Sequence, residues 1–303
     1  MLRFHRLMRT FNKEGRGLVR SLTLLLTTLI AIQLPAPGQA DSSANVVVLG
    51  DSQISFGAGE VYLDFFKNIK SHCKTPSISP AAIERLGARK TVAIGVRSTS
   101  LETWTARGGK AKNPICEVDK QYGVNAGVYG LNGNRDRKFV QIGRDRGVKF
   151  CHKNQSSLEG LFGPAGYDPD LLVMAFVGNS AAKWANSPGD LEKYVRETLK
   201  QIPDDVPCVF LTTVPVFSKK TNSLRVKAQA NLVRAVENTG GRCTIVEGLT
   251  PQTRGAIEGH AQFFKRNKSG KVVDPLHPSK RATRTFLKSI APKLCAAVNQ
   301  VLK

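Results

Sequence analysis

The stretch that decides the fold is Asn45-Val46-Val47-Val48-Leu49-Gly50-Asp51-Ser52, an apolar run that ends in a turn-forming glycine. A β-branched run this short, closed by a glycine, favours a buried strand. Ser52 then follows the carboxyl end of that strand, which is where open α/β sheets bind their ligands. This placement makes Ser52 a candidate functional residue.

A second motif lies near the other end of the chain, where Asp274-Pro275-Leu276-His277 precedes the last helical segment. A serine hydroxyl becomes a good nucleophile only when a base takes its proton, and the base needs a third group that fixes its tautomer. His277 and Asp274 are the residue types that fill those two roles. Each motif is short enough to arise by chance, so each has an alternative interpretation without a catalytic role. Ser52 would then belong to a turn that ends the strand, and His277 would be a polar residue before a helix that begins at Pro278.

Between the two motifs, predicted strands alternate with predicted helices, as a sheet covered by helices requires. The pattern predicts an α/β fold, and 303 residues with 41% apolar content suffice for one full core. After the first strand, strands are expected at 91–94, 171–176, 208–212 and 243–246, and helices near 61–73, 191–202 and 224–237. The last helix carries a core-facing stripe of Leu287, Ile290, Leu294, Val298 and Val301 at helical spacing.

These motifs resemble the sequence blocks of the SGNH hydrolases, also called the GDSL family of esterases and lipases. Gly50-Asp51-Ser52-Gln53 is similar to the first block and Val177-Gly178-Asn179-Ser180 to the third, while Asp274 and His277 match the last. The resemblance implies that Ser52 is a nucleophile, His277 its base and Asp274 the carboxylate that orients the base.

The resemblance also implies an oxyanion hole, formed by the backbone N–H of Ser52, a backbone N–H after the second strand and the side-chain amide of Asn179. The family has a glycine at the second position, and counting from the strand places Ser98 there. A backbone N–H survives this change of side chain, so Ser98 is the expected donor, with Gly95 as the alternative if the loop is shifted. The third block also departs from the family, with Val177 in place of a glycine and Ser180 in place of an aspartate.

The fold implied by the resemblance is a flavodoxin-like three-layer sandwich around a five-stranded parallel sheet of order 2-1-3-4-5. The resemblance extends from about Val46 to the C-terminus but leaves residues 103–168 unexplained. Within this glycine-rich segment, residues 128–142 predict a hairpin with an Asn-Gly turn. We expect an inserted lobe that follows the second strand and lies over the active site.

All six cysteines lie after residue 40, as expected for an exported chain with disulfides. Six cysteines allow fifteen pairings, which the implied sheet narrows. Two cysteines open neighbouring parallel strands, and two others lie on helices that cover the same face of the sheet. Buried free thiols are the alternative, and no metal site is expected because the usual ligand spacings are missing. The expected disulfides are Cys208–Cys243, Cys73–Cys295 and, by what remains, Cys116–Cys151.

The first 40 residues differ in kind from the rest. Six Lys or Arg residues precede the apolar stretch Leu22–Leu34, which is followed by Gly38-Gln39-Ala40. This pattern predicts a signal peptide over residues 1–40, because the apolar stretch is short for a bilayer span and a small-x-small cleavage site follows it. The mature chain is then a single domain over residues 41–303, periplasmic or secreted, without a membrane span; an uncleaved N-terminal anchor is the alternative.

The chain is strongly basic, with a formal net charge of +22. Removal of the leader, with its six basic and one acidic residues, leaves +17. Such a field attracts polyanions. Nucleic acid is not expected in an exported protein whose aromatic residues are not interleaved with its basic ones, so an anionic envelope polymer is the better partner. Residues 103–153 alone carry eleven basic and four acidic residues, which indicates either a solvated surface or an anion-binding lid.

Together these features predict an exported serine esterase without a cofactor. It would hydrolyse O-acyl esters, most simply O-acetyl groups on a glycan, through a Ser-His-Asp triad and an acyl-enzyme. Two alternatives stay open: an O-acyltransferase with the same triad, and a catalytically silent glycan-binding domain of the same fold. The acyl chain length and the oligomeric state are not indicated by the sequence.

Overall fold

The computed structural model describes residues 46–74, 76–86, 91–107, 126–129, 139–140, 153–162, 166–167 and 169–303. The expected leader, the expected Cys116–Cys151 disulfide and the Asn-Gly turn of the predicted hairpin lie outside these residues. None of the helices within these ranges is both long and apolar enough to cross a membrane.

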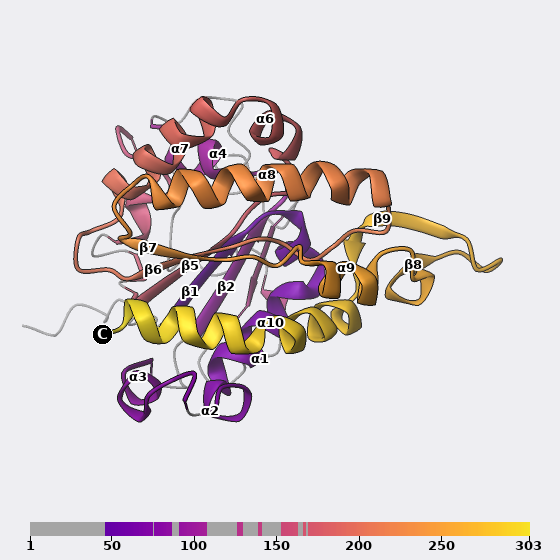
Figure 1. The fold of residues 1–303 in the computed structure, drawn as a ribbon, viewed down its shortest axis with the longest axis horizontal. Coiled ribbons are helices and arrows are strands. Elements are labelled where there is room, and N and C mark those ends of the chain that lie inside the picture. Colours follow the sequence, from indigo (N-terminus) through magenta and orange to yellow (C-terminus); the bar gives the residue numbers. More distant parts are fainter. Residues whose placement is uncertain are drawn as a thin grey trace, which may run out of the picture. The chain divides into compact units, whose positions relative to one another are not determined.

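The centre of the fold is a sheet of seven described strands in the order β4-β3-β2-β1-β5-β6-β7 (Figure 1). The five strands β2, β1, β5, β6 and β7 are neighbours in this order and run parallel, which confirms the predicted order 2-1-3-4-5. Their bounds are Thr91–Val96 for β2, Val46–Gly50 for β1, Leu171–Ala175 for β5, Cys208–Leu211 for β6 and Cys243–Val246 for β7.

Strand β1 occupies the middle of the sheet, and its five residues are fully buried. A parallel strand covered on both faces is expected to be apolar throughout, which explains the unbroken run Val46–Leu49. Val47 and Leu49 contribute to the core on one face, and Val46 and Val48 to the core on the other. The carboxyl end of β1 therefore points Ser52 toward the centre of one sheet edge.

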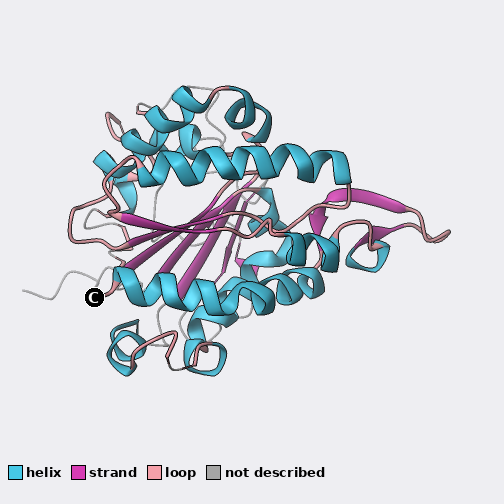
Figure 2. Ribbon diagram, in the orientation of Figure 1, coloured by secondary structure: helices cyan, strands magenta, loops and turns pink. Residues whose placement is uncertain are grey.

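Helices cover both faces of the sheet and complete the three layers (Figure 2). One face carries α4 (Leu101–Thr105), α6 (Ala181–Asn186), α7 (Pro188–Gln201), α8 (Lys219–Glu237) and the 3-10 turn η3 (Glu159–Leu161). The other face carries the π-helix η1 (Ile54–Ala58), α1 (Gly59–Lys67), α2 (Ile69–His72), α3 (Pro80–Leu86), α9 (Pro251–Ile257), η4 (Ala261–Phe263) and α10 (Lys280–Val301). The predicted single helix near 61–73 is thus divided between α1 and α2, with Asn68 at the break.

The two strands of the predicted hairpin are present among the described residues of the insertion. Its strands are β3 (Ala126–Tyr129) and β4 (Phe139–Val140), and β3 pairs antiparallel with β2. The insertion therefore widens the main sheet by two strands. The predicted five-stranded parallel sheet is confirmed, and the two antiparallel strands of the insertion are added to it at the β2 edge.

A second hairpin near the C-terminus was not predicted from the sequence. It consists of β8 (Phe264–Arg266) and β9 (Val272–Pro278), and Figure 1 shows it extending away from the main sheet. Asp274 and His277 both lie in β9 rather than in a loop. The last helix begins at Lys280 instead of Pro278, after Ser279, whose side chain accepts a hydrogen bond from the N–H of Ala282.

Two disulfides are present among the described cysteines, and both are expected pairs. Cys208–Cys243 joins the first residues of β6 and β7, and Cys73–Cys295 joins the end of α2 to α10. The second bond confirms that the first and last helical segments cover the same face of the sheet.

Candidate active site

The turn that carries Ser52 is unusually tight, because the π-helix η1 begins almost directly after β1. A Cβ atom on Gly50 would lie 2.2 Å from Cγ1 of Ile54, and a Cβ atom on Gly95 would lie 2.2 Å from the backbone nitrogen of Ser55. Both positions therefore exclude a side chain. This close packing explains the glycine of Gly50-Asp51-Ser52 in steric terms.

The histidine and the aspartate of the second motif are hydrogen-bonded to each other. Nδ1 of His277 lies 3.0 Å from Oδ1 and 2.9 Å from Oδ2 of Asp274. Oδ1 of Asp274 also accepts the backbone N–H groups of Leu276 and His277. With Nδ1 donating to the carboxylate, the lone pair of the imidazole is on Nε2, which is the nitrogen that a catalytic base uses.

The carboxylate of Asp274 is held in its ionised form. Partial burial alone raises its pKa, but the hydrogen bond to His277 and the charge of that ring lower it by more, with the two backbone N–H groups adding to the effect. The net result is a pKa below the ordinary value.

The Ser52 turn and the His277 strand are joined directly, although the residues that join them are 223 positions apart. Nε2 of Gln53 donates to the carbonyl oxygen of Leu276 at 3.2 Å and to that of Val214 at 3.3 Å. The ring of Phe56 also contacts the ring of His277, with centroids 4.5 Å apart. Among the described residues, no hydrogen bond joins Oγ of Ser52 to His277. Such contacts are often longer without substrate than in the reacting complex.

The segments after β2 and β5 also meet. Nδ2 of Asn179 donates to the carbonyl oxygen of Thr99 at 2.9 Å, which ties the loop of the third block to that of the second. Ser98 has a φ of 62°, in the left-handed region that favours glycine. Gly95, the alternative donor, lies inside β2 and pairs with β1 on one side and β3 on the other.

Two backbone donors near this edge of the sheet have no partner among the described residues. In the described part of the chain, the N–H groups of Ser52 and Ser98 have no hydrogen-bond acceptor. Ser52 follows β1, Ser98 follows β2 and Asn179 follows β5, and these three strands are neighbours in the sheet. Donors at the ends of adjacent parallel strands are well placed to converge on one ligand atom.

A buried carboxylate and a buried guanidinium lie behind the Ser52 turn. A Cβ atom on Gly178 would lie 2.8 Å from Oδ2 of Asp51 and 2.9 Å from Nη2 of Arg225, so both groups pack against this glycine. Burial raises the pKa of Asp51, against the lowering effects of the hydrogen bond from the Gln53 N–H and of the charge of Arg225. Burial correspondingly lowers the pKa of Arg225, and Asp51 opposes that shift.

Several of these residues were not identified from the sequence. Gln53 lies within the first block, but only the structure reveals its bond to the His277 segment. Phe56 and Arg225 belong to helical stretches in which nothing distinguishes them from ordinary helix residues. No group of three or more His, Cys, Asp or Glu side chains that could hold a metal ion is found in the described part of the chain.

Comparisons with known proteins found likeness only at the level of structure. No family model and no curated protein matches the sequence. The chain is similar to a DUF4886 family protein from Bacteroides uniformis, with 12% identity, a TM-score of 0.41 and coverage of 86% of this chain and 93% of that one.

It is also similar to a family two carbohydrate esterase from Clostridium thermocellum in complex with cellohexaose, with 12% identity and a TM-score of 0.40. That match covers 85% of this chain and 64%, just under two thirds, of the esterase chain. A third similar structure is described as a candidate platelet activating factor from Streptococcus pneumonia, with 12% identity, a TM-score of 0.38 and coverage of 83% and 84%.

Proposed function

We propose that this protein is a serine esterase whose nucleophile is Ser52. The observation that carries the proposal is the Gln53 side chain, which hydrogen-bonds the turn of the candidate nucleophile to the strand of the hydrogen-bonded His277–Asp274 pair. A serine on one segment, and an imidazole oriented by a carboxylate on a second segment, are what nucleophilic acyl transfer requires.

In the first half of the reaction, Oγ of Ser52 attacks the ester carbonyl carbon while Nε2 of His277 takes the hydroxyl proton. Asp274 holds the ring in the tautomer that leaves Nε2 free to do so. The tetrahedral intermediate collapses as the carbon–oxygen bond to the alcohol breaks, and His277 gives the proton to the departing oxygen. An acyl ester on Ser52 remains.

In the second half, water replaces the alcohol. His277 takes a proton from the water as its oxygen attacks the acyl carbon, and returns that proton to Oγ of Ser52 as the acyl bond breaks. The carboxylic acid leaves, and the enzyme is restored.

The oxyanion of each tetrahedral intermediate would be held by the N–H groups of Ser52 and Ser98 and by the amide of Asn179. The left-handed backbone of Ser98 supports its assignment over Gly95, because it places a serine in the conformation that a glycine adopts most readily. One such donor typically contributes about 3 kcal/mol to transition-state stabilisation.

The proposed substrate is a small O-acyl ester, most simply an O-acetyl group, carried on a glycan. Phe56, which is 55% exposed beside His277, offers a flat apolar face on which a sugar ring can lie. Val273 and Leu276 are 51% and 46% exposed on β9, and together with Phe56 they leave room for a longer acyl chain as the second choice. The proposed location is outside the cytoplasm, which the two disulfides support.

Labelling with a fluorophosphonate probe tests the nucleophile. Ser52→Ala should abolish labelling and aryl-ester hydrolysis, whereas Ser223→Ala, a change on the exposed side of α8, should affect neither. Absence of labelling in the wild-type protein would favour the silent glycan-binding domain. A panel of aryl esters of increasing chain length would then define the acyl group, and a product assay with an acceptor sugar would separate hydrolysis from acyl transfer.

Asn179→Ala tests the oxyanion hole separately from the nucleophile. We expect kcat to fall by about a hundredfold or more, with probe labelling retained and the fold unchanged. An unchanged kcat would remove Asn179 from the site.

A further inference from the structure

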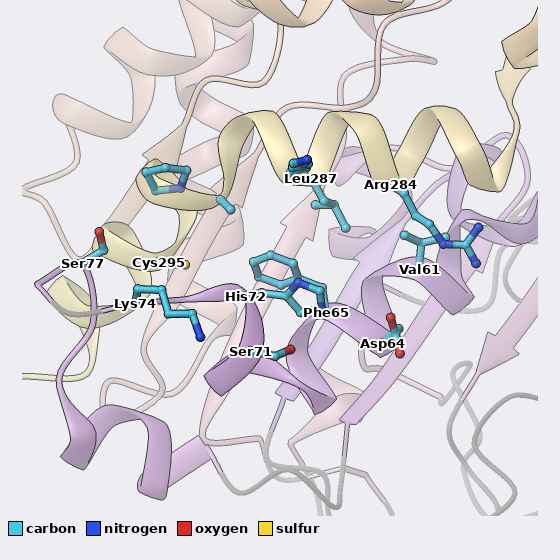
Figure 3. A pocket seen from close by; sticks show the side chains of 13 residues that line it. Val61, Asp64, Phe65, Ser71, His72, Lys74, Ser77, Arg284, Leu287 and Cys295 are labelled. Carbon is cyan, nitrogen blue, oxygen red and sulfur yellow. The ribbon is translucent and has the colours of Figure 1, made fainter.

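A cavity of about 590 Å³ lies between α1–α2 and α10, and none of its lining residues belongs to the candidate active site. The volume is within the range of sites that bind small organic molecules. Figure 3 shows it below α10, with the rings of Phe65 and His72 at its centre, Lys74 at one end and Arg284 at the other.

The floor of the cavity is apolar and rigid. It is formed by Val61, Phe65, Leu287 and Cys295, all at most 5% exposed, and the disulfide from Cys295 to Cys73 ties its two walls together. The ring of His72 stacks on that of Phe65 with centroids 5.0 Å apart and planes 14° apart. An occupant of this floor must offer an apolar body.

The rim of the cavity is cationic. Lys74, Arg284 and Lys288 line it together with one carboxylate, Asp64. The side chains of Arg284 and Lys288 have no hydrogen bond or ion pair with any other described residue, and Nζ of Lys74 reaches only the carbonyl oxygen of Lys70 at 3.4 Å. Asp64 already accepts a hydrogen bond from Asn68 at 2.9 Å. The rim therefore has an excess of positive charge that the other described residues do not neutralise.

We propose that this cavity binds a single-chain amphiphile with an anionic head group, such as a long-chain carboxylate or alkyl phosphate. The chain would lie on the floor between α1 and α10, and the head group would lie against Arg284, Lys288 or Lys74 at the rim. An inorganic anion would leave the apolar floor in contact with water, and a neutral lipid would make no use of the three cations. A free sugar would find few hydrogen-bonding partners on this floor.

The cavity is distinct from the proposed esterase centre. It lies between the helix that follows Ser52 and the helix that follows His277. Helix α1 continues from η1 beyond Ser52, and α10 begins three residues after His277. The ligand is therefore proposed as a bound effector or carried molecule, and its binding does not depend on Ser52.

Calorimetric titration of the protein with dodecanoate and with dodecyl phosphate, each below its critical micelle concentration, tests the proposal. We expect saturable binding of one or both, which also identifies the preferred head group. Dodecanol and acetate should each bind at least tenfold more weakly, because one lacks the charge and the other the chain. Added salt should weaken the binding of the charged amphiphiles.

Two variants locate the site. Arg284→Glu/Lys288→Glu removes two rim cations and should weaken binding at least tenfold, while Lys293→Glu, an exposed change on α10 outside the cavity lining, should not. Ala291→Phe fills the cavity from a partly exposed position and should abolish binding. If this variant does not fold, the charge variants decide alone. The absence of binding to the wild type would overturn the proposal. Equal binding to the wild type and to Arg284→Glu/Lys288→Glu would also overturn it, because the amphiphile would then occupy another site, such as the proposed esterase centre.

Discussion

The imidazole of His277 and the carboxylate of Asp274 fix each other, and this interaction makes the stability of the protein depend on pH. Because the pKa of Asp274 is lower in the folded state than its ordinary value, the pair stabilises the fold fully at pH values above the unfolded pKa of about 3.9. That contribution is lost as the pH falls through the lowered folded pKa.

Urea unfolding of the wild type and of Asp274→Asn at several pH values checks this dependence. The difference in unfolding free energy between the two proteins should shrink as the pH falls through the lowered pKa of Asp274. A difference that stays the same down to the acid limit would show that Asp274 is not held as an anion in the folded state.

Ser98 is predicted to be a strained residue whose side chain is dispensable. A non-glycine residue in the left-handed region costs about 1–2 kcal/mol. Substitution by glycine removes this cost, but the larger entropy of glycine in the unfolded state offsets part of the stabilisation. We therefore expect Ser98→Gly to be about 1 kcal/mol more stable than Ser98→Ala, with esterase activity retained in both because the backbone N–H remains. Equal stability of the two variants in chemical denaturation would argue against the left-handed conformation.

Short motifs allowed the site residues to be predicted as candidates, but not their mutual contacts. Ser52, Asn179 and His277 are each adjacent to a recognisable strand or helix boundary. The amide of Gln53 and the ring of Phe56 connect these segments, and no local pattern indicates which of many helix residues will face a strand that comes more than 200 positions later. Counting from the second strand indicated Ser98, but the φ angle that favours Ser98 over Gly95 is not revealed by the sequence.

At the scale of elements, the buried strands were predictable and the short peripheral ones were not. Strands β1 and β5 are apolar throughout because both of their faces are covered. The β8–β9 hairpin has a cationic turn and two prolines in β9, which argue against a strand when read locally. The pairing of β8 with β9 is set by tertiary contacts and is not visible in the local sequence. Asp274 and His277 were therefore expected directly before a helix rather than within a strand.

The two disulfides should stabilise the fold to different degrees, because they close loops of different length. Cys73–Cys295 spans 222 residues and Cys208–Cys243 spans 35, so loop-closure entropy predicts losses of about 5 and about 4 kcal/mol on their removal. Paired substitutions to serine, compared by chemical denaturation, measure both losses. A larger loss from the shorter loop would mean that native-state packing, rather than chain entropy, dominates.

At the scale of the whole molecule, alternation of strands and helices predicted an α/β fold, and the resemblance to the SGNH hydrolases implied the parallel order 2-1-3-4-5. The insertion broke that alternation. Strands β3 and β4 extend the sheet beyond β2 in the antiparallel sense, and a hairpin signal alone does not indicate which edge a hairpin will join. The side-by-side placement of α1 and α10, and with it the cavity between them, follows from the strand order and the Cys73–Cys295 bond.

The high positive charge predicts a salt-sensitive affinity for anionic polymers. With +17 on residues 41–303, the protein should be retained on a polyanionic matrix at low ionic strength and released as salt is added. Retention volumes measured over a salt gradient check this expectation, with a neutral matrix as the control. Release that does not depend on salt would mean that retention has another cause.

The order of the parts along the chain has a consequence for biosynthesis. Ser52 and its neighbours emerge from the ribosome early, but β9 supplies the imidazole and its carboxylate only after all the other described strands. Cys73 must wait for Cys295, which comes later still. A nascent or prematurely terminated polypeptide would thus possess a hydroxyl with nothing to activate it. The proposed esterase activity would therefore require that β9 has been synthesised and has paired with β8.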